Sequence, residues 1–76
     1  MAICTLKKFK QNKWGEICEV IENSLTPKLT DMGIFPGKKV KILFRAPLGD
    51  PLAIEIDGYT LSLRLDEANL ISVKDL

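Results

Sequence analysis

Apolar and polar residues alternate most clearly between residues 37 and 45, with the two-residue period of a half-buried strand. The side that we expect to face the core carries Val40, Ile42 and Phe44. The side that we expect to face solvent carries Lys39, Lys41, Leu43 and Arg45. The strand should end in a loop at residues 46–51, because Pro47 and Pro51 cannot donate to a ladder and Gly49 favours a turn.

The residues before this strand predict a short helix and a tight turn. Thr26 can cap the helix with its hydroxyl, Pro27 suits its first turn, and Gly33 can end it. Three apolar residues then share one helical face: Leu25, Leu29 and Met32. Pro36 and Gly37 are the pair that a type II turn requires, so we expect the chain to reverse there.

Four further strands are expected, at residues 16–21, 52–57 and 59–63 and around Ile71 and Val73. Asp57-Gly58 is a strong hairpin signal. In residues 16–21 the apolar positions do not alternate cleanly, so either a bulge or two partly covered faces would explain them. Single helical turns are expected at residues 5–9, where Thr5 can cap a turn that points Leu6 and Phe9 inward, and at residues 65–69.

These elements predict a mainly β fold: a small antiparallel barrel of about five strands with one short helix and single-turn connectors. The chain has 76 residues, enough for a single domain at 1–76 but not for a large internal active-site cavity. No membrane-spanning apolar run or secretion signal is visible, so a cytoplasmic location is expected. Free thiols are then expected at Cys4 and Cys18.

The chemistry that the sequence offers argues against catalysis. The chain has no histidine, no phosphate-cradling loop and no dinucleotide fingerprint, so we predict no enzyme and no cofactor. The two cysteines lack the spacing of a structural zinc site, and we predict no metal site. The carboxylates have simpler roles at a helix end, in turns and in a solvated first helical turn: Asp31, Asp50, Asp57, Asp66 and Glu67.

Several short motifs, taken in order, resemble the FeoA family of small cytosolic components of bacterial ferrous-iron uptake. They are Asp31-Met32-Gly33-Ile34, Pro36-Gly37, Ala46-Pro47-Leu48-Gly49-Asp50-Pro51, Gly58-Tyr59-x-Leu61-Ser62-Leu63-Arg64, Glu67-Ala68 and Ile71-x-Val73. The resemblance implies the SH3-like version of the barrel. Asn12 stands where the family pattern usually has a glycine, and asparagine tolerates the left-handed conformation.

The resemblance also implies a function and a partner. We expect a non-enzymatic accessory protein that binds the cytosolic part of the FeoB membrane GTPase transporter and meets the membrane only through it. The predicted contact surface is the outward side of the central strand with the following loop: Lys39, Lys41, Leu43, Arg45, Pro47 and Leu48. The simpler alternative is a solvated strand face and a structural turn. Weak self-association remains open.

Two other functions are alternatives. The same SH3-like domain resembles the C-terminal domain of DtxR-type iron-dependent repressors, which would make the protein a nucleic-acid- or repressor-associated module. Against this, the net charge is only +1 and no DNA-reading helix pair is visible, so no nucleic-acid partner is expected. Binding of proline-rich peptides is less favoured still, because Trp14, Tyr59 and the three phenylalanines are scattered.

Overall fold

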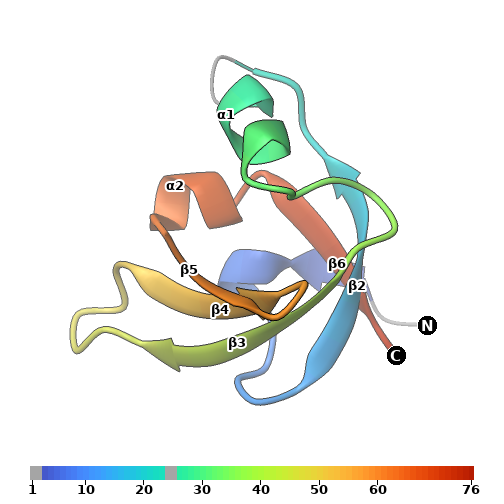
Figure 1. Cartoon of the computed structure of the whole chain (residues 1–76). Helices are drawn as coiled ribbons and strands as arrows, with labels where there is room; N and C mark the ends of the chain where they lie inside the picture. The colour runs from blue at the N-terminus through green and yellow to red at the C-terminus, as the bar shows by residue number, and fades with distance from the viewer. Residues whose placement is uncertain (1–2, 24–25) are drawn as a thin grey trace.

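Six strands form one antiparallel sheet in the order β1-β6-β2-β3-β4-β5, and the sheet curls around the core (Figure 1). This computed structural model describes residues 3–23 and 26–76. The strands are β1 (Ile3–Thr5), β2 (Trp14–Val20), β3 (Lys39–Arg45), β4 (Leu52–Ile56), β5 (Tyr59–Leu63) and β6 (Ile71–Asp75). The helical elements are η1 (Leu6–Lys8), α1 (Thr26–Asp31) and α2 (Leu65–Ala68). The predicted fold class is confirmed, with β1 as an additional strand that is too short to show a pattern in the sequence.

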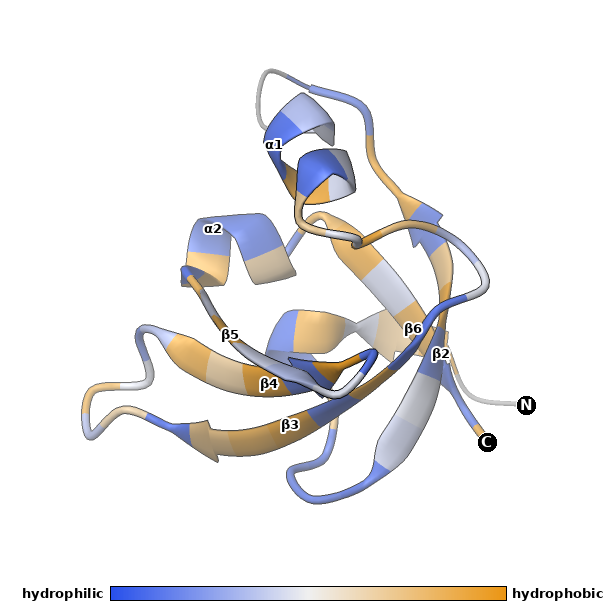
Figure 2. Ribbon diagram, in the orientation of Figure 1, coloured by the Kyte–Doolittle hydropathy of each residue, from blue (hydrophilic) through white to orange (hydrophobic). Residues whose placement is uncertain are grey.

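The core lies inside the curved sheet and is closed by the three helical elements. Figure 2 shows hydrophobic residues concentrated along β3, β4 and β6 and hydrophilic residues on the outer sides of α1 and α2. Twelve large side chains are almost fully buried: Leu6, Ile17, Leu29, Ile34, Val40, Ile42, Leu52, Ile54, Ile56, Leu63, Ile71 and Val73. Each contributes about 1.5–3 kcal/mol relative to an exposed position, so this cluster is the main source of stability.

The N-terminal turn packs as predicted but is not capped as predicted. Leu6 and Phe9 are both buried, and Phe9 fills the space beside Gly15. A Cβ atom added to Gly15 would lie 2.7 Å from the ring of Phe9, which explains why β2 has a glycine there. Thr5 makes no side-chain hydrogen bond to η1, and within the described residues its Oγ1 atom is buried without a partner. The expected capping role of Thr5 was therefore wrong.

Gly33 and Gly37 confirm the two predicted chain reversals. Gly33 has φ +88° and ends α1. Its N–H donates to the carbonyl of Thr30 (3.0 Å), and the N–H of Ile34 donates to that of Leu29 (2.9 Å), which is a Schellman motif. Gly37 has φ +97°, and the next N–H donates across the turn to Phe35 (3.3 Å), as in a type II turn. Leu29 is buried and Met32 half-buried as expected, whereas Leu25 lies outside the described residues.

The hydroxyl of Thr26 has a different role from the predicted helix cap. It accepts the N–H of Asn23 (2.8 Å) and donates to the carbonyl of Ile21 (2.8 Å). Thr26 is already the first helical residue, so its side chain faces back toward the end of β2 and ties α1 to that strand.

A β-bulge interrupts each of the two long strands. In β2 the register shifts between Ile17 and Glu19, so the bulge explanation of the irregular pattern holds. In β3 it shifts between Ile42 and Phe44. This second bulge overturns the predicted alternation, because each bulge moves the following residues by one position. Phe44, expected in the core, is 58% exposed, and Arg45, expected to face solvent, lies opposite the buried Leu52.

The other tight turns follow the sequence. Asp57 and Gly58 have φ values of +52° and +81° and join β4 to β5 in a two-residue hairpin, as type I′ requires. Asn12 has φ +63°, so it takes the left-handed conformation expected of it, and its N–H donates to Ile42 (2.7 Å).

Glu67 is buried, which corrects the expectation of a solvated first helical turn. Its Oε1 atom accepts the N–H of Arg64 (2.9 Å), and its Oε2 atom is paired with the ammonium of Lys28 (2.6 Å). Burial alone would raise the pKa of Glu67, but the Lys28 contact and the Arg64 N–H outweigh it and hold this pKa below the ordinary carboxyl value. The ion pair joins α1 to α2.

No described helix is long and apolar enough to cross a membrane.

Candidate functional site

The loop between β3 and β4 presents the most exposed large hydrophobic side chain of the described residues. Leu48 is 94% exposed at the loop tip, next to the exposed Pro47. Two backbone hydrogen bonds fix the loop: the N–H of Gly49 donates to Ala46 (2.7 Å), and the N–H of Ala46 donates to Pro51 (3.1 Å). Gly49 has φ +86°, which a side chain at that position would strain. The sequence therefore holds an apolar residue in solvent on a defined turn.

Phe44 adds a second exposed apolar group at the end of β3, and sequence reasoning missed it. In register it lies opposite Ala53, while Lys41 lies opposite Glu55, so both are on the outer face of the sheet. The small side chain of Ala53 leaves much of the Phe44 ring uncovered. A signal was available, because Ile42, Leu43 and Phe44 are three consecutive apolar residues and so break the alternation.

Two of the predicted lysines lie on the outer face of β3 beside Trp14. The ammonium of Lys41 is 5.4 Å from the centroid of the Trp14 ring, which is a cation–π contact. Lys39 is exposed and, with Trp14 and Leu76, lines an open hollow of about 550 Å³. The cations therefore border Phe44 on the side away from the loop.

Arg45 is half-buried, and its guanidinium is engaged by the N-terminal turn. Its Nη1 atom donates to the carbonyl of Lys7 (2.9 Å) and its Nη2 atom to that of Phe9 (2.7 Å). The planar guanidinium suits this double contact, which fastens the N-terminal turn to the sheet. Leu43 is the half-buried bulge residue. Of the six predicted contact residues, Lys39, Lys41, Pro47 and Leu48 thus remain on the surface with Phe44, while the guanidinium of Arg45 is bonded to the N-terminal turn.

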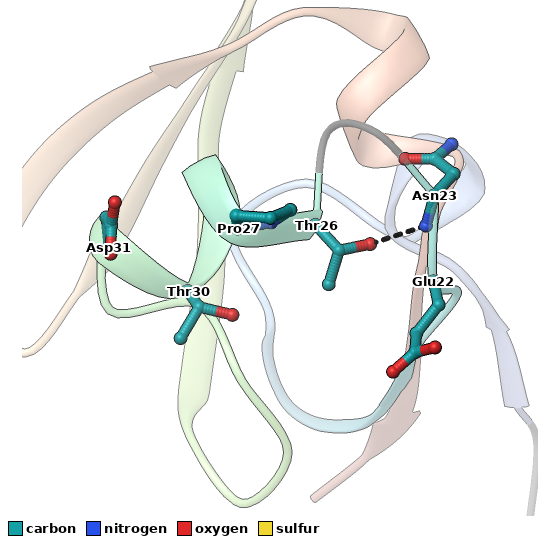
Figure 3. Close-up of a pocket in the computed structure, with 6 residues that line it drawn as sticks. All are labelled: Glu22, Asn23, Thr26, Pro27, Thr30 and Asp31. Atoms are coloured by element: carbon teal, nitrogen blue, oxygen red, sulfur yellow. Dashed lines mark hydrogen bonds between the residues drawn. The ribbon is translucent and has the colours of Figure 1, made fainter.

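A second hollow lies beside α1 and is open to solvent. It measures about 680 Å³ and is lined by Glu22, Asn23, Thr26, Pro27, Thr30 and Asp31 (Figure 3). The Thr26 hydroxyl already makes two hydrogen bonds. The described lining residues include two carboxylates and two threonine hydroxyls but neither a thiol nor a cationic side chain.

The side chains that bind metals do not gather in the described part of the chain. Residues 3–23 and 26–76 hold no group of three or more Cys, Asp or Glu side chains close enough to share an ion. Cys4 and Cys18 are both half-buried free thiols. Cys4 lies opposite Val73 of β6, and Val73 lies opposite Ile17 of β2, so β6 runs between the two cysteine-bearing strands.

Residues 4–75 match the model of the FeoA domain. The chain belongs to the FeoA family. The resemblance of the sequence motifs to FeoA is therefore confirmed, and family membership associates the chain with ferrous-iron transport.

Solved FeoA structures share both sequence and fold with the chain. The FeoA-like protein of Clostridium acetobutylicum is 34% identical, with a TM-score of 0.91 over 100% of this chain and 90% of that one. Iron(II) transport protein A of Clostridium thermocellum is 32% identical, with a TM-score of 0.90 over 96% of this chain. The chain spans only 46% of the length of that second protein.

A more distant FeoA shows the fold alone. The FeoA of Stenotrophomonas maltophilia, described as a procaryotic SH3 domain protein in complex with zinc, is 21% identical. Its TM-score is 0.82, over 93% of this chain and 89% of that one. The curved antiparallel sheet is thus the SH3-like fold that the family resemblance implied.

Proposed function

We propose that this protein is a non-catalytic accessory component of ferrous-iron uptake that works in the cytoplasm by binding the cytosolic part of a FeoB-type GTPase transporter. Family membership supports the link to ferrous-iron transport. For the FeoA of Stenotrophomonas maltophilia, a role as a bacterial ferrous-iron transport activating factor has been suggested, which is the same class of role.

The observation that carries the proposal is the exposed apolar surface at the end of β3. Single exposed apolar residues are ordinary, but here Leu48 stands on a hydrogen-bonded turn that follows the exposed Phe44. Lys39 and Lys41 lie on the outer face of the same strand. An apolar centre with a charged rim is the usual composition of a protein–protein contact. The contact surface is therefore Lys39, Lys41, Phe44, Pro47 and Leu48.

Regulation through this surface requires a difference in affinity between two states of the transporter. A small rigid domain shifts a conformational equilibrium only by as much as it prefers one conformation. Tight binding to one nucleotide state and weak binding to the other would bias the GTPase cycle. Equal affinity for the GTP-analogue and nucleotide-free states would contradict this mechanism while leaving the accessory binding itself intact.

The test is a titration of the protein into the transporter from the same cell, in nanodiscs, with and without a GTP analogue. Leu48→Asp should weaken binding by about tenfold or more, because it places a charge at the apolar centre of the contact. Ile3→Asp is the matched control, since Ile3 is 60% exposed and lies in β1, which pairs with neither β3 nor β4. Absence of binding in every nucleotide state, or equal losses for the two variants, would refute the proposal.

The same preparation tests two further expectations. Binding to duplex or single-stranded nucleic acid that falls steeply with salt would favour the repressor-like alternative. Calorimetry with ferrous iron should show no one-to-one site. Micromolar binding that is lost when Cys4 and Cys18 are both replaced would overturn that expectation.

A further inference from the structure

β5 is an open edge of the sheet. It is the last strand in the sheet order and pairs only with β4. Ile56 and Tyr59 flank the two-residue turn, and in such a hairpin the flanking residues exchange hydrogen bonds. Leu61 and Leu63 therefore also bond to β4, whereas the backbone N–H and C=O groups of Thr60 and Ser62 point away from it. In the described chain no other strand pairs with that side.

This edge lacks the features that usually keep sheet edges apart. Residues 59–63 contain no charged residue and no proline, and the pairing of β4 with β5 has no bulge. Tyr59 is 69% exposed, and Thr60 and Ser62 are exposed. The opposite edge, β1, is only three residues long. β5 is thus the better template for an added strand.

We propose that β5 binds β5 of a second copy of this chain, antiparallel and across a two-fold axis. Thr60 of each copy then lies opposite Ser62 of the other, and Leu61 lies opposite Leu61. Thr60 and Ser62, whose backbone groups point away from β4, are two positions apart. In this register their N–H and C=O groups therefore form four hydrogen bonds between the two copies. The contact is self-complementary, as a two-fold interface requires.

The charges at the two ends of the strand favour this orientation. Asp57 comes just before β5 in the turn, and Arg64 follows directly after β5. Arg64 is exposed, and its Nη2 atom lies 3.9 Å from Oδ2 of Asp50, a long contact that leaves the other guanidinium donors for a second carboxylate. Antiparallel pairing brings Arg64 of each copy next to Asp57 of the other, whereas parallel pairing would bring like charges together. Lys38 contacts only the Oδ2 atom of Asp57, so Oδ1 can accept from the incoming guanidinium. The edge is therefore complementary to itself in charge as well as in hydrogen bonding.

The size of the contact predicts a weak dimer. A five-residue strand pair buries less than the roughly 1,200–2,000 Å² of a stable interface, so dimers should form only at high concentration. The interface residues, Thr60 to Ser62, differ from those of the proposed transporter contact, although Phe44 and Ser62 both lie opposite Ala53. Dimerisation is measured without the transporter, so its failure and that of the proposed function can be told apart.

The first test is amide hydrogen exchange of the full chain, followed by NMR from about 10 µM to about 1 mM, a range suited to weak affinities. In the monomer, the amides of Thr60 and Ser62 should exchange fast and that of Leu61 slowly. Raising the concentration should protect Thr60 and Ser62 together with the appearance of dimer in sedimentation velocity. A monomer at every concentration, or protection that grows at β1 instead, would overturn the proposal.

Ser62→Pro removes one outward N–H while leaving the bonds to β4, because proline is tolerated on the free side of an edge strand. It should weaken dimerisation by about tenfold or more, while Ser62→Thr, which keeps the N–H, should not. Arg64→Glu serves as a second variant in case the proline disturbs folding. It should also weaken the dimer, because it places two carboxylates together at each end. Unchanged dimerisation in a folded Ser62→Pro or in Arg64→Glu would refute this register.

Discussion

β2 and β3 are two seven-residue strands with the same geometry and different chemistry. Each is exposed at its first residue, buried at its second and fourth, and bulged at its fifth. After the bulge, β2 turns Glu19 outward and Val20 inward, which is what hydrophobicity favours. β3 turns Phe44 outward and Arg45 inward, which is the reverse. The backbone thus explains where these residues point but not why β3 carries them.

The difference separates structural from functional constraint. The inward arginine in β3 has a structural explanation, since two backbone carbonyls of the N-terminal turn accept its hydrogen bonds. The outward phenylalanine has none in the described chain. An exposed aromatic that the fold does not require is the kind of residue that a partner would bury. Four substitution experiments test this contrast.

The largest effect is expected at the residue before each bulge. Ile17→Ala and Ile42→Ala should each cost about 2–5 kcal/mol, because both side chains are buried and each truncation leaves a cavity. Denaturant unfolding measures both values. If one substitution lowers the free energy of unfolding by more than about twice as much as the other, the residues before the two bulges do not contribute equally to stability. The structural equivalence of β2 and β3 would then be wrong.

Replacement of Arg45 should cause the next largest loss of stability. Arg45→Met keeps much of the volume but leaves the carbonyls of Lys7 and Phe9 without their donor, which should cost about 1–3 kcal/mol in the free energy of unfolding. Lys39→Met at the exposed start of the same strand is the control and should stay within about 0.5 kcal/mol. Equal effects would mean that the Arg45 contacts contribute nothing to stability.

Glu67, like Arg45, joins two elements through polar contacts, but unlike Arg45 it loses its charge in acid. Glu67→Gln should cost about 1–2 kcal/mol at pH 7, because the amide loses the charge paired with Lys28. The native pKa of Glu67 is lowered, so its contribution is present above the unfolded value of about 4.3 and is lost as the pH falls through the lower native value. Unfolding curves of wild type and Glu67→Gln should therefore converge in acid. The gap between wild type and Arg45→Met should not close, since arginine stays charged.

The smallest stability effect is expected at the outward residues after the bulges. Phe44→Thr and Glu19→Thr should each change the free energy of unfolding by about 0.5 kcal/mol or less, because both side chains are exposed. The two should differ in the transporter titration, where Phe44→Thr weakens binding and Glu19→Thr does not. Binding that is unaffected by Phe44→Thr would remove Phe44 from the contact surface.

Features fixed by one or two residues were predictable from the sequence. The reversals at Gly33, Gly37 and Asp57-Gly58 depend on backbone angles that few residues tolerate, so their positions were right. The core positions Val40 and Ile42 were also right, because they precede the bulge.

Features set by tertiary contacts were not predictable in the same way. The bulge in β3 depends on how β4 pairs, so the orientations of Phe44 and Arg45 were wrong. Glu67 looked like a solvated residue of a short helix, because its partner Lys28 is 39 positions away in the chain. The same holds for the candidate surface. Its loop was predictable from Pro47 and Gly49, but the exposure of Phe44 was not, because it depends on the register shift in β3.

β1 pairs with β6, with Ile3 opposite Lys74 (Figure 1). The first and last strands of the sheet are therefore neighbours. A domain whose first and last strands are neighbours can be inserted into another chain without being distorted, because its two points of attachment are close together. The same adjacency makes the domain a good candidate for circular permutation, with a linker from the end of β6 to the start of β1 and a new opening in an exposed loop.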